Sequence, residues 1–519
     1  MTLDLAGAAA DAEARIARGE RDPHLFNLVA WNRADHGDLI GATALLDQVL
    51  ARDPGEPESL TSKAALLRRQ GRLREAVLHC DAAIRSAPDY PDAWLERGFV
   101  FASGGSMERA RECYERAIQL EPAIAAAHAG LAAIAARDGD DTAGRHYARA
   151  ALALDPGNII AITALATLDL EAGRPRDARN RLEPIVATLT EPDGDRTLAF
   201  GLLGDAYGRL GEPARAYAAY AQANADFAWI HAAQFAEREP HHAFISGVGN
   251  AVAQLDFTAT LHPVGSAPAV ANHLFLLGYP RSGNTLLENV LASLPDVVAL
   301  EERPTLRAAD QDFLADPAGL ARFAALSEDS LVPYRTDYWD KVAQAGVDAT
   351  NRGFVDMDPL KGTRLPLIAR LFPQARILIM RRDPRDVVWS CFRTQFALTN
   401  AAMDFTTLER TALHYDAMMR LLETAQARLS LAFHVVRYEN LVTDFDTTTR
   451  TLCAFADLAW NPAVRRFDRT ATARGVATAS AGQVRKGLYD GRRQWEPFAP
   501  WLEPVMPILE PWLVRFGYT

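Results

Sequence analysis

The feature that most constrains this chain is a spacing of 34 residues that recurs through its first half. A glycine stands once in each interval, at Gly37, Gly71, Gly105, Gly139 and Gly173. Prolines follow with the same period, at Pro54, Pro88, Pro122 and Pro156. A further unit begins at Gly211 after a slip of four residues. A fixed period of this length predicts a solenoid of stacked repeats.

The units resemble the tetratricopeptide repeat, in which a glycine marks a turn, small residues let two helices approach, and a proline ends the second helix. Small or aromatic residues match between units, as in Ala76, Cys80 and Ala83, then Ala110, Tyr114 and Ala117. The resemblance implies an α-solenoid with a concave groove, which we expect over residues 1–230. We expect a peptide or protein partner in the groove; alternatively, the array only supports the second half or forms a homodimer.

Composition and charge exclude several classes of protein. The chain has 519 residues, more than one compact core accommodates, and its 49% hydrophobic and 23% charged residues are typical of a folded soluble protein. A net charge of -11 makes a nucleic-acid partner a poor expectation. The four cysteines form no CxxC pair, which argues against a disulfide framework or zinc cluster. We expect no signal peptide or membrane anchor, and a cytoplasmic location.

Residues 231–270 are predicted to form a helical connector, because helical stretches alternate there with proline-rich breakers. The adjacent His241 and His242 could suggest a metal site, but no cysteine or spaced third ligand accompanies them. We therefore expect a solvated turn at these two histidines. A second domain is predicted over residues 271–519.

The second domain opens with an apolar run from His273 to Gly278, then a glycine-containing loop, then an amphipathic pattern. Strand, loop and helix in this order place backbone N–H groups around an anion. The spacing is that of the nucleotide loop GxxxxGK[ST], but Asn284 stands at the lysine position. Loss of that lysine argues against a phosphate-loop kinase, which we keep as one alternative.

Residues 279–288, YPRSGNTLLE, resemble the 5′-phosphosulfate loop of sulfotransferases. The loop is of the PRSGTT type, found in protein-tyrosine sulfotransferases and in bacterial proteins that join tetratricopeptide repeats to a sulfotransferase domain. The resemblance implies a three-layer α/β phosphate-loop domain with a parallel sheet. It also implies 3′-phosphoadenosine 5′-phosphosulfate as the sulfate donor, with no metal. Its 5′ side would contact Arg281, Ser282, Gly283, Asn284 and Thr285.

Four later stretches resemble the same family in the same order. After the first helix, Glu301 and Glu302 lie where tyrosine sulfotransferases carry a glutamate pair whose second member, here Glu302, is the catalytic base. Ser480 aligns with a serine that contacts the sulfuryl group, so the resemblance implies catalytic roles for Glu302, Ser480 and Arg281. The implied nucleotide and 3′-phosphate contacts are Arg382, Ser390, Tyr438, Arg485, Lys486 and Gly487.

One departure concerns a lysine that the family carries before an Asp-Pro pair and that is thought to stabilise the leaving oxygen. Met357 stands at that place here. Lys361 follows a few residues later and could substitute from the next helix, or be a surface lysine near a helix start. Arg281 could also carry this role alone.

The sequence thus predicts a sulfotransferase that acts on a hydroxyl group, chiefly by positioning its reactants and by presenting fixed positive dipoles. The acceptor could be a peptidyl tyrosine, another protein or peptide hydroxyl, or a hydroxylated small molecule. The alternative to an active enzyme is a repeat scaffold whose nucleotide-binding domain is catalytically weak, which Met357 favours.

Overall fold

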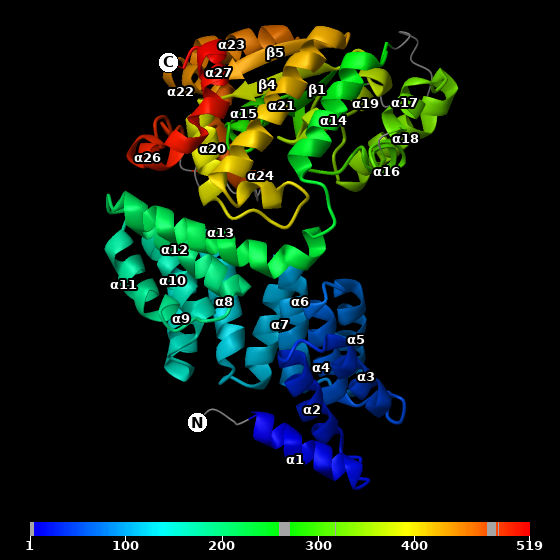
Figure 1. Cartoon of the computed structure of the whole chain (residues 1–519), viewed down its shortest axis with the longest axis vertical. Helices are drawn as coiled ribbons and strands as arrows, with labels where there is room; N and C mark the ends of the chain where they lie inside the picture. Colours follow the sequence, from blue (N-terminus) through cyan, green and yellow to red (C-terminus); the bar gives the residue numbers. More distant parts are fainter. Residues whose placement is uncertain (1–4, 259–269, 317, 475–483, 486, 519) are drawn as a thin grey trace. The chain divides into compact units, whose positions relative to one another are not determined.

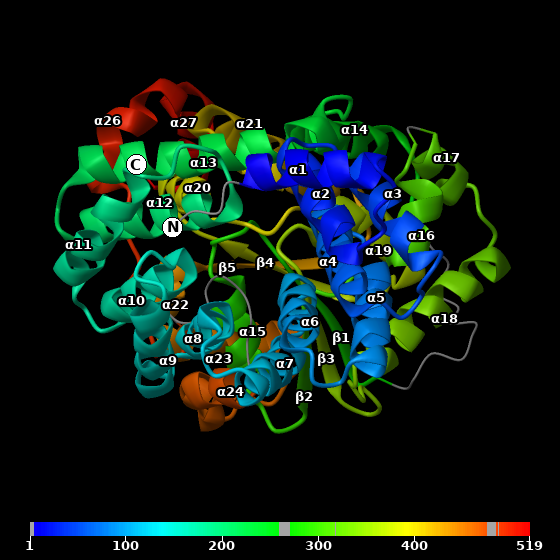
Figure 2. The same cartoon turned by 90° about the horizontal axis from the view of Figure 1, so that it is seen from below.

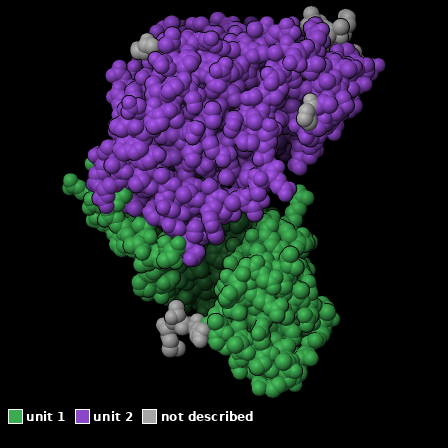
Figure 3. Space-filling model, in the orientation of Figure 1, with its two compact units in different colours: residues 1–190, 205–210 green, residues 191–204, 211–519 purple. Residues whose placement is uncertain are grey.

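The computed structural model describes the chain except for residues 1–4, 259–269, 317, 475–483, 486 and 519. The described chain forms two compact units, one of residues 1–190 with 205–210 and one of residues 191–204 with 211–519 (Figure 3). Among these described ranges, we find no helix with the length and apolar character that a membrane span requires.

The first unit consists of antiparallel helix pairs, which confirms the predicted α-solenoid (Figure 1). Every predicted turn glycine from Gly37 to Gly173 has a φ between 72° and 87°, a region that favours glycine. The helices are α1 (Leu5–Ala17), α2 (Pro23–Asp35), α3 (Leu39–Leu50), α4 (Pro57–Arg69), α5 (Leu73–Ser86), α6 (Pro91–Ser103), α7 (Met107–Leu120), α8 (Ala125–Asp138), α9 (Asp141–Leu154), α10 (Ile159–Glu171) and α11 (Pro175–Val186).

The small residues of the repeat make room for one large ring between neighbouring helices. Tyr114 of α7 is buried against Gly98 of α6 and Gly130 of α8. A Cβ atom would lie 2.4 Å from the Tyr114 ring at Gly98 and 2.5 Å from it at Gly130. Both positions therefore require glycine, because real side chains do not approach so closely.

The second unit is built around a parallel sheet with the strand order β2-β3-β1-β4-β5 (Figure 2). Helices cover both faces: Leu276 of β1 joins a core with α15 and α23, whereas Phe275 faces Tyr338 of α18 at a ring distance of 6.0 Å. This confirms the predicted three-layer α/β domain. The strands are β1 (Asn272–Leu277), β2 (Val297–Glu301), β3 (Gly353–Met357), β4 (Arg376–Arg381) and β5 (Ala432–Arg437).

The helices of this unit precede, separate and follow the strands in the chain. They are α12 (Gly194–Arg209, mostly in this unit), α13 (Pro213–Phe235), α14 (His241–Gln254), α15 (Asn284–Ala292), α16 (Arg307–Phe313), α17 (Gly319–Ala324), α18 (Glu328–Gln344), α19 (Leu365–Leu371), α20 (Pro384–Arg393), α21 (Leu408–Arg428), α22 (Tyr438–Thr443), α23 (Phe445–Ala456), α24 (Phe467–Arg474), α26 (Ala499–Leu502) and α27 (Met506–Phe516). Short 3₁₀ turns join several of them, including η1 (Lys361–Arg364).

Helix α13, the last helix of the repeat pattern, belongs to the second unit. The Tyr217 ring stacks on Phe392 at 5.5 Å and on Trp501 at 5.1 Å. The buried Asn224 donates its amide N–H to the carbonyl oxygen of Phe392 at 2.8 Å. Phe392 lies in α20, so the final repeat helix packs directly on a helix of the α/β domain.

The two histidines at the start of α14 do not form the solvated turn that the sequence suggested. His241 Nδ1 lies 2.8 Å from His414 Nε2 of α21, and His414 Nδ1 lies 2.8 Å from the Tyr279 hydroxyl. His242 Nδ1 lies 3.2 Å from the buried carboxylate of Asp404. The expectation is therefore wrong, because both side chains join polar networks with the buried residues His414 and Asp404. In the described part of the chain, no three His, Cys, Asp or Glu side chains gather as metal ligands would.

Candidate active site

The loop between β1 and α15 has the backbone shape of an anion-binding loop. Gly283 has a φ of 103°, and α15 begins at Asn284, so the first N–H groups of the helix face the loop. A Cβ atom at Gly283 would lie 2.9 Å from the Tyr438 ring and 3.0 Å from Met380 Cε. Glycine is thus required both by the backbone angle and by the space available.

Asn284 stands where nucleotide-binding loops carry a lysine, and its side chain stabilises the loop by a hydrogen bond within it. Its side-chain N–H donates to the carbonyl oxygen of Tyr279 at 2.8 Å, and the residue is buried. The predicted hydrogen-bond donor is therefore present, but it bonds to the loop itself. Ser282 and Thr285, the other predicted loop contacts, are buried too.

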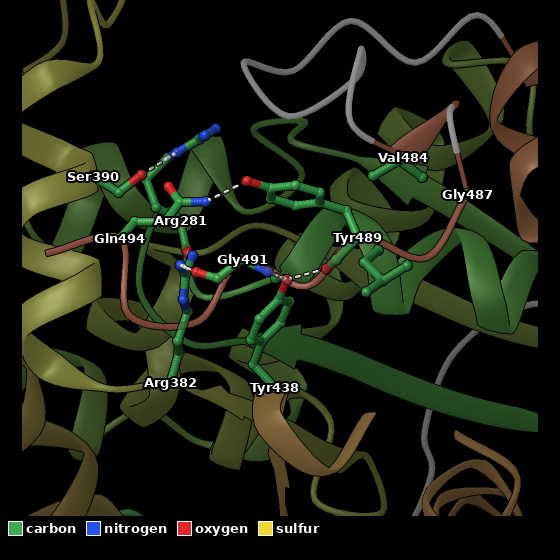
Figure 4. A pocket seen from close by; sticks show the side chains of 11 residues that line it. Arg281, Arg382, Ser390, Tyr438, Val484, Gly487, Tyr489, Gly491 and Gln494 are labelled. Carbon is green, nitrogen blue, oxygen red and sulfur yellow. Dashed lines mark hydrogen bonds between the residues drawn. The ribbon is translucent and has the colours of Figure 1, made fainter. Parts of the chain in front are cut away.

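A cavity lies beside this loop (Figure 4). Its volume is about 520 Å³, which includes the space at its entrance that is open to solvent. It lies at the carboxyl-terminal edge of the parallel sheet, where such folds bind their ligands. The structure brings six of the predicted residues together in its lining. The full lining is Arg281, Gly283, Leu286, Arg382, Ser390, Tyr438, Val484, Gly487, Tyr489, Gly491 and Gln494.

The two arginines of the cavity are held by neighbouring oxygen atoms. Arg281 Nε donates to Ser390 Oγ at 3.0 Å, and Arg382 Nη1 donates to the Arg281 carbonyl oxygen at 3.0 Å. Arg382 Nη2 donates to the carbonyl oxygen of Gly491, and its guanidinium lies 4.8 Å from the Tyr438 ring centroid. The residues predicted for the 5′ and the 3′ phosphate therefore share one connected cluster (Figure 4).

The far wall of the cavity was mostly missed by sequence reasoning. It consists of Val484, Gly487, Tyr489, Gly491 and Gln494. The Tyr438 hydroxyl donates to the carbonyl oxygen of Tyr489 at 2.6 Å and accepts the Gly491 N–H at 3.0 Å. Behind the wall, buried Asp386 accepts the backbone N–H groups of Arg493 at 2.8 Å and of Trp495 at 3.1 Å. Apart from the predicted contacts Arg485, Lys486 and Gly487, no sequence motif falls in this stretch of the chain.

Glu302 follows β2 at the same edge of the sheet. Its backbone N–H donates to the Met357 carbonyl oxygen at 2.7 Å, and its φ is 43°. The residue is exposed to solvent, yet protein around its carboxyl group, with Asp358 and Glu301 nearby, raises the pKa of Glu302 to about 7. A carboxyl group with this pKa can accept a proton near neutral pH.

Positive φ angles at residues other than glycine concentrate around this site. Among the described residues only five have them: Arg281, Glu302, Asn351, Asp457 and Arg493. Two of these five, Arg281 and Glu302, are predicted catalytic residues, and Arg493 directly precedes Gln494 of the cavity wall. Such backbone conformations cost on the order of 1–3 kcal/mol each and cluster at functional sites.

Lys361 is buried and is not a surface lysine, so that alternative is wrong. Its Nζ bonds to the buried carboxylate of Asp356 and lies 3.3 Å from Thr305 Oγ1 and 3.4 Å from the Arg303 carbonyl oxygen. Lys361 does not line the cavity, although its charge lowers the pKa of Glu302. Met357 is fully buried in the core.

Three predicted residues remain. Ser480 and Lys486 lie outside the described residues. Arg485 lies between cavity residues Val484 and Gly487 and is partly buried.

Comparison with known proteins finds similarities for both parts of the chain. Residues 273–462 match the model of the sulfotransferase family, and residues 30–91, 66–118 and 95–159 match that of the tetratricopeptide repeat. An uncharacterised protein of Aquifex aeolicus (strain VF5) is 28% identical over 250 residues, which cover 46% of this chain and 32% of that protein. The chain thus spans about a third of the length of this relative.

Two further similarities concern one part of the chain each. Protein-tyrosine sulfotransferase 1 of Danio rerio is 26% identical over 257 residues, 47% of this chain and 72% of that protein. The crystal structure of PilW, a type IV pilus biogenesis factor, aligns over 40% of this chain and 95% of its own, with 19% identity and a TM-score of 0.34. The second half of the chain is thus similar to proteins of the sulfotransferase family, and the first half to tetratricopeptide repeats.

Proposed function

We propose that this protein is a sulfotransferase that moves the sulfuryl group of 3′-phosphoadenosine 5′-phosphosulfate to an acceptor hydroxyl. The observation that carries the proposal is the joined cluster of Arg281, Ser390 and Arg382 beside a phosphate loop without lysine. Two arginines and a hydroxyl in one cavity suit a ligand with two separate phosphate-type groups. The family match over residues 273–462 supports the same donor.

In this mechanism, the loop N–H groups at the start of α15 and Arg281 bind the 5′ phosphate, on which negative charge builds as the sulfuryl group leaves. Arg382 and Ser390 bind the 3′ phosphate. For this, Arg382 exchanges its bond to the Gly491 carbonyl oxygen for the phosphate. Glu302 accepts the proton of the attacking hydroxyl, a role that its raised pKa supports.

A kinase that uses the same loop is disfavoured by two residues. The Asn284 amide is committed to the Tyr279 carbonyl oxygen and cannot replace the charge of a lysine. Asp356, at the end of β3, is fully buried and bonds to Lys361, Thr305 and Tyr338. This carboxylate is therefore already neutralised, unlike one that helps to hold Mg²⁺ in a nucleoside triphosphatase.

For the acceptor we propose a peptidyl tyrosine, supported by the similarity to protein-tyrosine sulfotransferase 1 of Danio rerio. The repeats would recruit the acceptor or a partner protein, because such solenoids present extended concave surfaces. A second candidate is a binding protein with weak catalysis, which the buried Met357 and the ion-paired Lys361 favour. Donor binding without turnover would identify it.

Calorimetric titration with 3′-phosphoadenosine 5′-phosphate, alongside ATP with Mg²⁺, tests the proposal. We expect binding of the 3′-phosphorylated nucleotide, weakened about 10- to 100-fold in Arg382→Ala, since a charged hydrogen bond contributes about 1.5–3 kcal/mol. Arg420→Ala is the matched control, because Arg420 pairs with Asp416 and does not line the cavity. Preference for ATP, or no binding, would refute the proposal.

A further inference from the structure

The proposed base Glu302 begins a sharp bend, residues 302–305, that β3 holds at both ends. At the first end, β2 pairs with β3, and the Glu302 N–H donates to the carbonyl oxygen of Met357 at 2.7 Å. At the second end, the Thr305 hydroxyl donates to Asp356 Oδ2 at 2.8 Å. Asp356 directly precedes Met357, so two successive residues of one strand fix the backbone on either side of Glu302.

Lys361 contacts the same bend from η1. Its Nζ bonds to the Asp356 carboxylate, and it also lies 3.4 Å from the carbonyl oxygen of Arg303, the residue that follows Glu302. Thr305 Oγ1 is 3.3 Å from the same nitrogen. The ammonium group of Lys361 is therefore bonded to polar atoms of the bend, whereas it does not line the cavity.

The Asp356 carboxylate is itself held from other elements of the domain. The Tyr338 hydroxyl of α18 donates to Asp356 Oδ2 at 3.0 Å, and His273 Nε2 of β1 lies 2.8 Å from the oxygen of that hydroxyl. Asp356 and Thr305 have no surface exposed to solvent. A buried carboxylate that accepts from Lys361, Thr305 and Tyr338 is satisfied, and such a network is rigid. We call these four residues the Asp356 cluster.

The bend needs this support because Glu302 has a φ of 43°. Residues other than glycine seldom adopt such an angle, and it persists only where the surrounding structure determines it. We propose that the Asp356 cluster determines it: Lys361 and Thr305 are positioning residues that hold the bend, and with it the carboxyl group of Glu302, at the sheet edge. Lys361 then serves the reaction through Glu302 and not by contact with the leaving oxygen. The inference rests on the proposed function, in which Glu302 is the base.

Substitutions at Thr305 test the inference without changing any charge. Thr305→Val replaces the hydroxyl with a methyl group and releases the second end of the bend from Asp356. We expect kcat to fall by up to about 100-fold, the cost of misplacing a catalytic group by about 1 Å. The affinity for 3′-phosphoadenosine 5′-phosphate, measured by calorimetry, should stay unchanged. Thr305→Ser keeps the hydroxyl and should restore kcat.

Thr449→Val is the matched control. Thr449 is equally buried, and its hydroxyl donates to the carbonyl oxygen of Phe445 at 2.9 Å within α23. The control therefore loses a buried hydroxyl and keeps its kcat. Equal kcat values in Thr305→Val and Thr449→Val would overturn the inference. A Thr305→Ser protein no more active than Thr305→Val would overturn it as well.

A double-mutant cycle separates positioning by Lys361 from direct action on the leaving oxygen. Lys361→Met is combined with Asp356→Asn, because a buried charge left without its partner would destabilise the fold. This pair is then compared in the presence of Glu302 and in Glu302→Gln. If Lys361 acts by placing Glu302, the pair lowers kcat only while Glu302 is present. A similar loss in the Glu302→Gln protein would show an independent role for Lys361 and would refute the inference.

Hydrogen exchange followed by mass spectrometry provides a readout that needs no turnover. The N–H groups of Glu302 and Thr305 bond to the carbonyl oxygens of Met357 and Arg303, at 2.7 Å and 2.8 Å. A peptide of residues 298–307 should exchange faster in Thr305→Val than in the wild type, in Thr305→Ser or in Thr449→Val. Unchanged exchange would contradict the inference whatever the activity. Faster exchange in a protein without turnover would support the hold on the bend and count against the proposed function alone.

Discussion

Two residues at this site, Arg281 and Glu302, combine a positive backbone φ angle with a side chain that the proposed reaction uses. Arg281 has a φ of 68° and reaches Ser390, while Glu302 has a φ of 43° and a pKa raised to about 7. Neither angle is needed to build a strand or helix. The fold maintains both, which aims the arginine into the cavity and keeps the carboxyl group at the sheet edge.

The pH–rate profile follows from the pKa of Glu302. A general base must be ionised, so we expect kcat/KM to rise with pH and to reach half of its plateau near pH 7. Glu302→Gln removes the base and should lower kcat by about 100- to 10,000-fold. Titration with 3′-phosphoadenosine 5′-phosphate should give an unchanged affinity in this variant; a parallel loss of affinity would assign Glu302 to donor binding instead.

Gly283→Ala is expected to impair the phosphate loop. The added methyl group would lie 2.9 Å from the Tyr438 ring, at a φ of 103° that side chains rarely adopt. We expect weaker binding of 3′-phosphoadenosine 5′-phosphate, measured by calorimetry. Gly247→Ala in α14 is the control, since a Cβ atom there meets nothing within 4 Å. Equal affinities in the two variants would contradict the tight fit of the loop.

At the scale of elements, α13 supports the helix that carries Ser390. Asn224 bonds to the carbonyl oxygen of Phe392, two residues beyond Ser390 in α20. We expect Asn224→Ala to lower the free energy of unfolding by about 1–3 kcal/mol, because it leaves a buried carbonyl group unpaired. Asn400→Ala, at an exposed position, serves as the control in thermal unfolding. Equal melting temperatures for the two variants would argue against a supporting role of α13.

Sequence reasoning found the elements whose signal is local in the chain. The glycine period located the repeat turns, and the order of strand, loop and helix located Gly283 and Arg281. It missed contacts between remote residues, which no spacing encodes: Arg474 meets Glu288 across 186 positions. The histidines of α14 were misjudged for the same reason, since their partners lie in η2 (Ala402–Phe405) and in α21.

For the whole molecule, the packing of α13 predicts where the chain can be divided. A fragment of residues 271–519 loses Tyr217 and Asn224 and exposes the rings of Phe392 and Trp501 to water. We expect a fragment of residues 191–519 to be the more soluble and to unfold cooperatively, as followed by circular dichroism. Equal behaviour of the two fragments would mean that α13 is dispensable for the α/β domain.

The far wall of the cavity also bears on how the protein is made. The wall residues Val484, Gly487, Tyr489, Gly491 and Gln494 line the cavity, yet they follow the five described strands in the chain. The repeats and the five strands are therefore synthesised before the proposed donor site is complete. A chain that ends before this wall would keep Arg281, Arg382 and Ser390, but it would lack the Gly491 carbonyl oxygen that accepts a hydrogen bond from Arg382. The cavity would then be open on this side.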